Sequence, residues 1–183
     1  MFEFWIGYAS MAFGAIIIAF YIAYLRYRFE RYLALKGDFW NQEVDAKSKI
    51  KYLIIPFTLY IISIVVLLYY YSELERLAAF WVHFDLNGNP DILMPLNMFI
   101  AFNVLFGLII FSPILISFPG RETIKFISKT YFLIFIIWLL MEGDVVYYNL
   151  FKKHFIAHPT LVLIFILTLS FPLLYITFKD RRY

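Results

Sequence analysis

Cysteine is absent from the 183-residue chain, and charged side chains make up only 16% of it. Without cysteine, disulfide bonds, thiolate metal sites and a thiol nucleophile are excluded, and the redox compartment stays undetermined. The sequence also contains no phosphate-binding glycine loop, no nucleophile-elbow motif and no haem-type pair of helical histidines. The net charge of +3 is modest, so we expect no nucleic-acid partner.

Hydrophobic side chains, in contrast, make up 63% of the chain and aromatic side chains 22%, which lies far outside the range of soluble proteins. A helix that crosses a bilayer needs about 20 mostly apolar residues, because the hydrocarbon core is about 30 Å thick. Five segments are long and apolar enough: 4–25, 52–71, 96–118, 131–150 and 160–178. Since lipid cannot hydrogen-bond a backbone amide, these spans should be helices. The sequence predicts an all-α integral membrane protein, with residues 1–183 forming one bundle of five transmembrane helices in the lipid bilayer.

The basic residues predict how these helices are oriented. Counted over alternate connections, thirteen of the 16 Lys and Arg residues fall on one side and three on the other. The positive-inside rule puts the thirteen in the cytoplasm, so the amino terminus lies outside and the carboxyl terminus inside. The cytoplasmic loop 26–51 should then be an interfacial helix or an irregular segment on lipid headgroups, whereas the insert 72–95 is extracytoplasmic. We expect a multi-pass inner-membrane protein whose first span is a retained anchor, because Arg26 and Arg28 follow it directly.

A short polar sequence inside the insert predicts a hairpin-like element. Asn87-Gly88 is a strong turn signal, because both residues tolerate positive φ. The alternation over 81–86 predicts a short strand that leads into this turn. Pro90 prevents ordinary ladder pairing on the return, so the second arm should be irregular.

Two polar side chains of this strand, His83 and Asp85, would share one face and form a binding surface. The alternative is that the insert is a rigid connector. In that case Trp81 lies at the headgroups and Asp91 caps the next helix.

All three histidines, His83, His154 and His158, fall on the predicted outer side. His154 and His158 are spaced i, i+4, which on a helix would point both imidazoles the same way. Together with His83 and a carboxylate they would form a plausible zinc shell. Against this, Pro159 disfavours helical geometry at His158, and the alternative is a pair of interfacial histidines beside two lysines. No cofactor is predicted outright, and zinc is the one metal that these residues suggest.

Two acids interrupt the fourth span, Glu142 and Asp144. If that span runs to Leu150, Asp144 lies about 9 Å below its outer end. Carboxylates at that depth usually face a bundle interior or a wet cavity, which would make this pair a cation or proton site. The alternative is a span that starts near Phe126, with Gly143 near the surface and 145–151 as an interfacial segment.

The first span carries small residues at a spacing of four, which allows close approach of another helix. This stripe predicts packing, and it could serve contact with a partner chain in a larger complex. Its members are Ser10, Gly14, Ala15, Ala19 and Ala23.

The insert resembles a known family. The pattern His83-Phe84-x-x-x-Gly88-x-Pro90-Asp91 between two membrane helices is similar to the signature of SdpI-like bacterial membrane proteins, which are toxin-immunity proteins and their uncharacterised relatives. The match covers about 25 residues. The prolines expected before the histidine are missing, and an apolar stretch replaces the usual polar one after the aspartate. The resemblance implies a non-enzymatic protein that protects against a membrane-active toxin and in some cases signals its presence.

We therefore expect a membrane protein that binds a ligand with its insert. The predicted binding residues are His83, Phe84, Asp85, Asn87, Gly88, Pro90 and Asp91, with Glu142 and Asp144 lining a cavity below. A second hypothesis is a small accessory subunit of a respiratory or transport complex, which fits the aromatic richness and the small-residue stripe. A third is a transporter that moves a cation or proton through Glu142 and Asp144.

Overall fold

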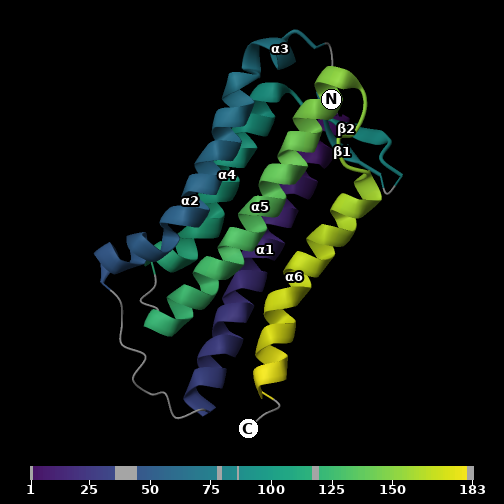
Figure 1. Ribbon diagram of the computed structural model, residues 1–183. Coiled ribbons are helices and arrows are strands. Elements are labelled where there is room, and N and C mark those ends of the chain that lie inside the picture. Colours follow the sequence, from purple (N-terminus) through teal and green to yellow (C-terminus); the bar gives the residue numbers. More distant parts are fainter. Residues whose placement is uncertain (1, 36–44, 78–79, 86, 117–119, 181–183) are drawn as a thin grey trace.

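The computed structural model describes residues 2–35, 45–77, 80–85, 87–116 and 120–180, and this part of the chain is mostly helical (Figure 1). Five long helices form a bundle, and a short helix and a two-stranded hairpin lie together at one end, which we call the hairpin end. The amino terminus lies at the hairpin end and the carboxyl terminus at the other. The elements are α1 (Phe2–Leu35), α2 (Ala46–Tyr69), α3 (Tyr71–Glu75), β1 (Trp81–Phe84), β2 (Pro90–Leu93), α4 (Leu96–Ile116), α5 (Arg121–Phe151) and α6 (His158–Asp180).

Three helices of the described part are long and apolar enough to cross a membrane. They are Lys47–Tyr69, Arg121–Phe151 and His158–Phe178, and Leu96–Ser112 is a shorter apolar helix. Their outward faces carry many exposed Ile, Leu and Phe side chains, a surface that suits lipid and would be an aggregation liability in water. These observations confirm a helical protein compatible with a bilayer.

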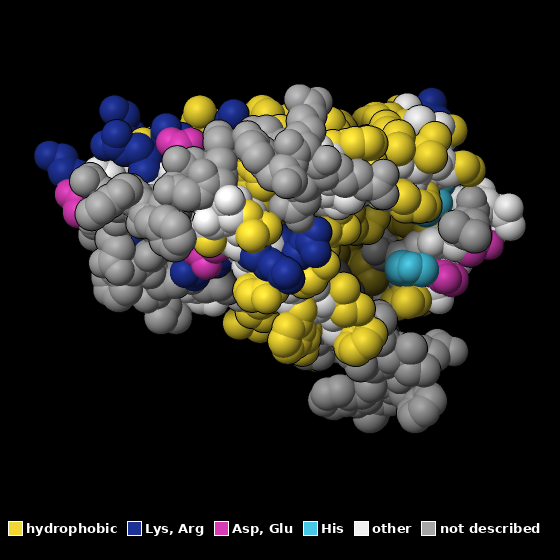
Figure 2. Space-filling view, turned by 90° about the horizontal axis from the view of Figure 1, so that it is seen from below, with side chains coloured by type: hydrophobic (Ala, Val, Ile, Leu, Met, Phe, Trp, Pro, Cys, Tyr) yellow, Lys and Arg dark blue, Asp and Glu magenta, His cyan; other side chains and the backbone are white. Residues whose placement is uncertain are grey.

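The charged side chains are divided between the two ends of the bundle. Seen from below, Lys and Arg gather over the left and middle of the molecule together with some acidic side chains, whereas histidine and further acidic side chains appear at the right edge (Figure 2). In the sequence, basic residues are concentrated at the end of α1 and the beginnings of α2 and α5. These helix ends lie away from the hairpin end, where the histidines are, so the bundle is polarised along its axis (Figure 1).

The ends of several helices differ from the sequence prediction. α1 continues ten residues past the predicted span 4–25, because Phe29, Tyr32 and Leu33 are buried beside α6 and an Arg26–Glu30 pair at 2.9 Å supports the turn between them. The predicted loop 26–51 is thus largely helix, and residues 36–44 lie outside the described residues. α2 begins at Ala46 rather than 52, since the carboxylate of Asp45 accepts the Ser48 N–H at 2.9 Å.

α5 also begins earlier, at Arg121 rather than 131, as the alternative for the fourth span expected. Residues 145–151, which that alternative makes an interfacial segment, form the last part of the same helix. α5 contacts α1, α2, α3, α6 and β1, so it is the central element. Its rings join an aromatic core, in which Phe135 stacks on Phe111 with centroids 5.1 Å apart and Trp138 stacks on Phe106 at 4.0 Å.

A close approach of α2 and α4 fixes one side of this core. The buried ring of Tyr60 lies directly on Gly107, and its hydroxyl donates to a backbone carbonyl of α4, being 3.2 Å from that of Val104. A Cβ at Gly107 would overlap the ring. A Cβ at Gly14 on α1 would meet nothing within 4 Å among the described residues, so this member of the small-residue stripe has room for a side chain. Ser10 and Ala15 have side chains outside the described part of the structure.

We expect Gly107→Ala to destabilise the bundle by about 1–3 kcal/mol, because the Tyr60 ring is packed between other aromatic rings and cannot move freely. Thermal unfolding in detergent measures this. Gly14→Ala is the matched control, which should be neutral or slightly stabilising because alanine is the better helix former. Equal effects of the two substitutions would contradict the close α2–α4 contact.

Candidate functional site

The hairpin has a tightly bonded turn. The Asp85 carboxylate accepts the backbone N–H groups of Asn87 and Asn89, both at 2.8 Å, and the Asn89 amide at 3.0 Å. These bonds, the Asn89 side chain first, lower the pKa of Asp85 below its usual value. Gly88 has φ of +85°, which favours glycine. The predicted strand 81–86 ends at Phe84, so Asp85 is an acceptor for the turn and not part of a strand face shared with His83.

The return arm is irregular, as Pro90 predicted, with register shifts on both sides of His83. His83 Nδ1 lies 2.7 Å from an oxygen of Asp91 on the neighbouring strand, and their side chains are 58% and 44% exposed. Asp91 therefore pairs across the hairpin and does not cap the next helix, which begins at Leu96. This overturns one part of the connector alternative. An exposed pair of this kind contributes little to stability.

A buried asparagine on α5 holds the hairpin against the bundle. The side chain of Asn149 accepts the Trp81 N–H at 2.8 Å and donates to the Trp81 carbonyl at 2.7 Å. The buried ring of Phe84 packs beside it on Tyr148, with centroids 4.7 Å apart. Asn149 could not be predicted as part of the site, because a lone asparagine in an apolar run does not reveal its partner.

Asp144 and two histidines form a cluster under the hairpin. One Asp144 oxygen lies 2.6 Å from His154 Nδ1, and the other accepts the Phe155 N–H at 3.0 Å. His154 Nε2 lies 2.9 Å from the Gly88 carbonyl oxygen. One oxygen of Asp144 and one nitrogen each of His154 and His158 lie within 4.8 Å of one another. Asp144 itself is only 2% exposed.

The histidines reach this cluster by a route that the sequence prediction did not foresee. His154 and His158 do not lie on one helix, since α5 ends at Phe151 and α6 begins at His158. Lys152 has φ of +57° and turns the chain back, which brings His154 against α5. His83 is not a member of the cluster, so the predicted zinc shell of three histidines is not assembled as drawn.

A pocket of about 440 Å³ opens between the hairpin, α5 and α6, and we call it the hairpin pocket. Five of the predicted site residues lie in its wall, namely His83, Phe84, Asp85, Asp144 and His158. The remaining lining is apolar apart from the backbone: Val82, Met141, Val145, Leu161 and Val162. The other predicted residues, Asn87, Gly88, Pro90 and Asp91, build the turn and strand that close one side. A mostly apolar pocket with a few converging polar groups is typical of a binding site.

No family model, curated protein or solved structure matches this chain. The resemblance to SdpI-like proteins therefore rests on the sequence pattern of five hairpin residues alone.

Glu142 and Asp144 lie on different sides of α5. Glu142 is buried toward the bundle interior, near Ser63 and Trp138. The Ser63 hydroxyl donates to the Tyr60 carbonyl, and the Trp138 N–H donates to the Asn103 side chain. Neither Glu142 oxygen has a hydrogen-bond partner among the described residues. Asp144 faces the hairpin pocket instead, because residues two apart on a helix point about 200° apart. The structure therefore does not bring the two carboxylates into one cation or proton site, and it does not fix their depth in a bilayer.

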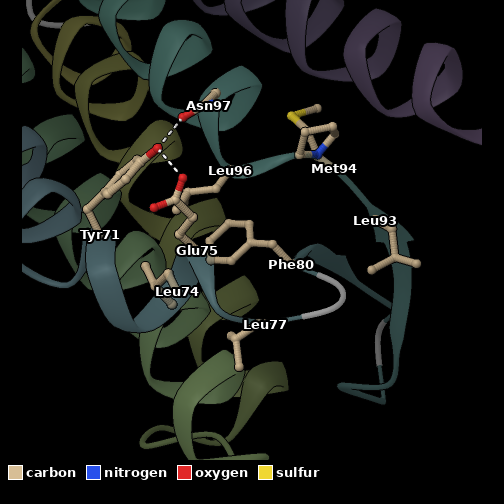
Figure 3. A pocket seen from close by; sticks show the side chains of 10 residues that line it. Tyr71, Leu74, Glu75, Leu77, Phe80, Leu93, Met94, Leu96 and Asn97 are labelled. Atoms are coloured by element: carbon tan, nitrogen blue, oxygen red, sulfur yellow. Dashed lines mark hydrogen bonds between the residues drawn. The ribbon is translucent and has the colours of Figure 1, made fainter.

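A second pocket, of about 310 Å³, lies beside α3 on the other side of β2 (Figure 3). The Tyr71 hydroxyl there lies 3.0 Å from a Glu75 carboxylate oxygen and 2.9 Å from the Asn97 amide oxygen. The rest of the lining shown is mostly apolar, including Leu74, Phe80 and Met94. The sequence analysis did not single out this pocket, and none of the predicted site residues lines it.

We expect Asn149→Ala to loosen the hairpin, because it leaves the Trp81 N–H and carbonyl without partners at a cost of about 1–3 kcal/mol. Hydrogen–deuterium exchange of residues 80–85 should then accelerate while α5 stays protected. Asn97→Ala is the control, since that asparagine is exposed and contacts α3 rather than β1. Unchanged exchange in Asn149→Ala would refute the role given to Asn149.

Proposed function

We propose that this chain is a non-enzymatic, multi-pass inner-membrane protein of the SdpI-like kind that binds a membrane-active toxin at its hairpin pocket. The observation that carries the proposal is that the residues of the family-like pattern build one wall of a pocket. His83 and Phe84 line it directly, Gly88 and Pro90 shape the turn and the return strand, and Asp91 pairs with His83. Each residue of the pattern thus contributes to a single binding surface.

The polarised bundle supports a membrane topology for this function. We propose five transmembrane helices, formed by α1, α2, α4, α5 and α6, with the basic end in the cytoplasm. The amino terminus and the hairpin pocket would then face outward, and the carboxyl terminus inward. In this orientation the pocket meets a toxin before the toxin enters the bilayer.

The surroundings of the pocket favour a particular ligand chemistry. Asp85 and Asp91 lie in or next to its wall, and the remaining lining is largely apolar. A ligand with an apolar face and a cationic group fits such a surface, and this combination is typical of membrane-active peptides. Capture of the peptide at the hairpin would lower the amount that reaches the lipid.

One observation favours a second function, that of an accessory subunit in a larger membrane complex. A Cβ at Gly14 would meet nothing within 4 Å among the described residues, and Ala23 is exposed. A partner helix could approach closely there. Native-gel migration after mild solubilisation tests this, because a subunit should migrate well above the 21.9 kDa chain with its detergent.

The topology predicts opposite labelling of two single-cysteine variants. Because the chain has no cysteine, Asn87→Cys and Lys47→Cys each introduce one thiol at an exposed position. A membrane-impermeant maleimide should label Asn87→Cys in intact cells and Lys47→Cys only after lysis. The unsubstituted chain should stay unlabelled. The reverse pattern would contradict the proposed orientation.

Protection against toxin predicts the phenotype of hairpin variants. Expression of the chain in a sensitive bacterium should raise survival and preserve the membrane potential when the cells meet cationic membrane-active peptides. His83→Ala and Asp91→Ala should each lower the peptide concentration that the cells survive by about tenfold or more. The amount of protein in the membrane should not change, because the His83–Asp91 pair is exposed. Asn97→Ala, beside the α3 pocket, should protect as well as the original chain. If only abundance falls in the hairpin variants, the connector alternative is favoured instead.

A further inference from the structure

We propose that Asp144, His154 and His158 bind one divalent transition-metal ion of the zinc type, with a free coordination position toward the hairpin pocket. This proposal does not rest on toxin binding, because it concerns metal binding by the isolated protein. The proposed ligand set differs from the zinc shell predicted from the sequence, which contained His83 and an unspecified carboxylate.

The cluster has the ligand atoms that zinc prefers. One carboxylate oxygen and two imidazole nitrogens lie within 4.8 Å of one another. Two ligand atoms of one tetrahedral zinc ion lie about 3.3 Å apart, since each bond is about 2.0–2.1 Å long. The ligand atoms that lie farthest apart therefore need to close by up to about 1.5 Å, and Asp144 and His154 need to move slightly apart. Calcium and magnesium prefer an all-oxygen shell, so the two imidazoles favour a transition metal.

The hydrogen bonds around His154 fix which of its nitrogens is available. Nε2 lies 2.9 Å from the Gly88 carbonyl, which can only accept, so Nε2 carries a proton. In the neutral ring Nδ1 then holds a lone pair, and it faces an Asp144 oxygen at 2.6 Å. Two acceptors at this distance share one proton, and a zinc ion bound by both atoms would replace that proton and hold them about 3.3 Å apart. Donation of the second ring N–H to a carbonyl is the usual way in which proteins orient a metal-binding histidine.

His158 supplies an independent observation. Its Nδ1 is buried and has no hydrogen-bond partner among the described residues. A buried polar atom without a partner costs free energy, which coordination at this imidazole would offset. His158 also lines the hairpin pocket together with Asp144. A metal ion held by these side chains would therefore border the pocket and could take a water molecule or a ligand group as its fourth partner.

The surrounding backbone holds these ligands in place. The second Asp144 oxygen accepts the Phe155 N–H, so the carboxylate cannot rotate freely. A Cβ at Gly88 would come within 3.1 Å of His154 Nε2 and 3.2 Å of the His158 Cβ. Only glycine allows the hairpin to bring its carbonyl onto His154 at this distance. The family-like glycine is thus an outer support of the metal site.

Metal content of the purified full chain tests the proposal. The chain is purified in detergent with a tag that contains no histidine, treated with a chelator, and dialysed against Zn²⁺. We expect about one zinc ion per chain by elemental analysis, and four- or five-coordinate visible absorption with Co²⁺ in its place. The chain has no cysteine, so thiolates cannot contribute to zinc binding. It has three histidines, so His83 is the one imidazole outside the proposed site.

Substitutions assign the ion to these residues. Asp144→Asn and His158→Ala should each weaken zinc binding by about tenfold to 100-fold in competition with a chromophoric chelator. Glu142→Gln is the matched control, a buried carboxylate two residues away on the same helix, and it should bind zinc normally. His83→Ala should also bind zinc normally, because His83 is not one of the three ligands.

A second measurement covers variants that fold poorly. Zinc at about 100 times its Kd should raise the Tm of the original chain by roughly 5 °C or more. His158→Ala should fold without metal, since its Nδ1 has no partner to lose among the described residues, but its Tm should not respond to zinc. The proposal is overturned if the original chain retains less than about one zinc ion per ten chains, or if Asp144→Asn and His158→Ala bind zinc as tightly as Glu142→Gln.

Discussion

The hydrogen-bonded series from Asp144 through His154 to the Gly88 carbonyl is the interaction on which the hairpin end depends. A carboxylate that is 2% exposed must be compensated, and a histidine ten residues later in the chain provides this. The same imidazole holds the hairpin turn through its other nitrogen. The His154 ring therefore fixes three segments relative to one another, namely α5, the connection that follows it, and the distant hairpin. The series therefore fixes the hairpin turn relative to α5, beside the pocket.

The rest of the hairpin end follows the same rule, that backbone polar groups beside an apolar bundle need internal partners. Asn149 satisfies both polar groups of Trp81, so β1 is held by α5 although a two-stranded hairpin is marginal by itself. In the interior, the Trp138 N–H is donated to Asn103, which joins α5 to α4. Since hydrophobic attraction between helices is weak in lipid, such bonds and close aromatic packing must hold the bundle together.

The sequence was sufficient for the elements that depend on local composition. Long apolar runs predicted helices, Asn87-Gly88 predicted the turn, and Pro90 predicted the irregular return strand. Helix ends were less predictable, because charged residues with good helix propensity extend α1 to Leu35 and α5 back to Arg121. The pairing of His154 with Asp144 could not be foreseen, because it needs Lys152 in a left-handed backbone conformation, which no feature of the sequence indicates. The i, i+4 spacing suggested that the two histidines are close, but the reason was wrong.

The pattern His-Phe-x-x-x-Gly-x-Pro-Asp gains a physical meaning from this arrangement. Phe84 anchors the hairpin on α5, Gly88 presents a carbonyl to His154, and Pro90 begins the strand on which Asp91 meets His83. The pattern therefore specifies how a hairpin sits on a helical bundle, whereas the groups that face the pocket from below, Asp144 and His158, come from outside it. A chain with the same pattern but without these partners would share the hairpin and lack the cluster. The chemistry of the site thus depends on α5 and α6 more than on the residues that carry the resemblance.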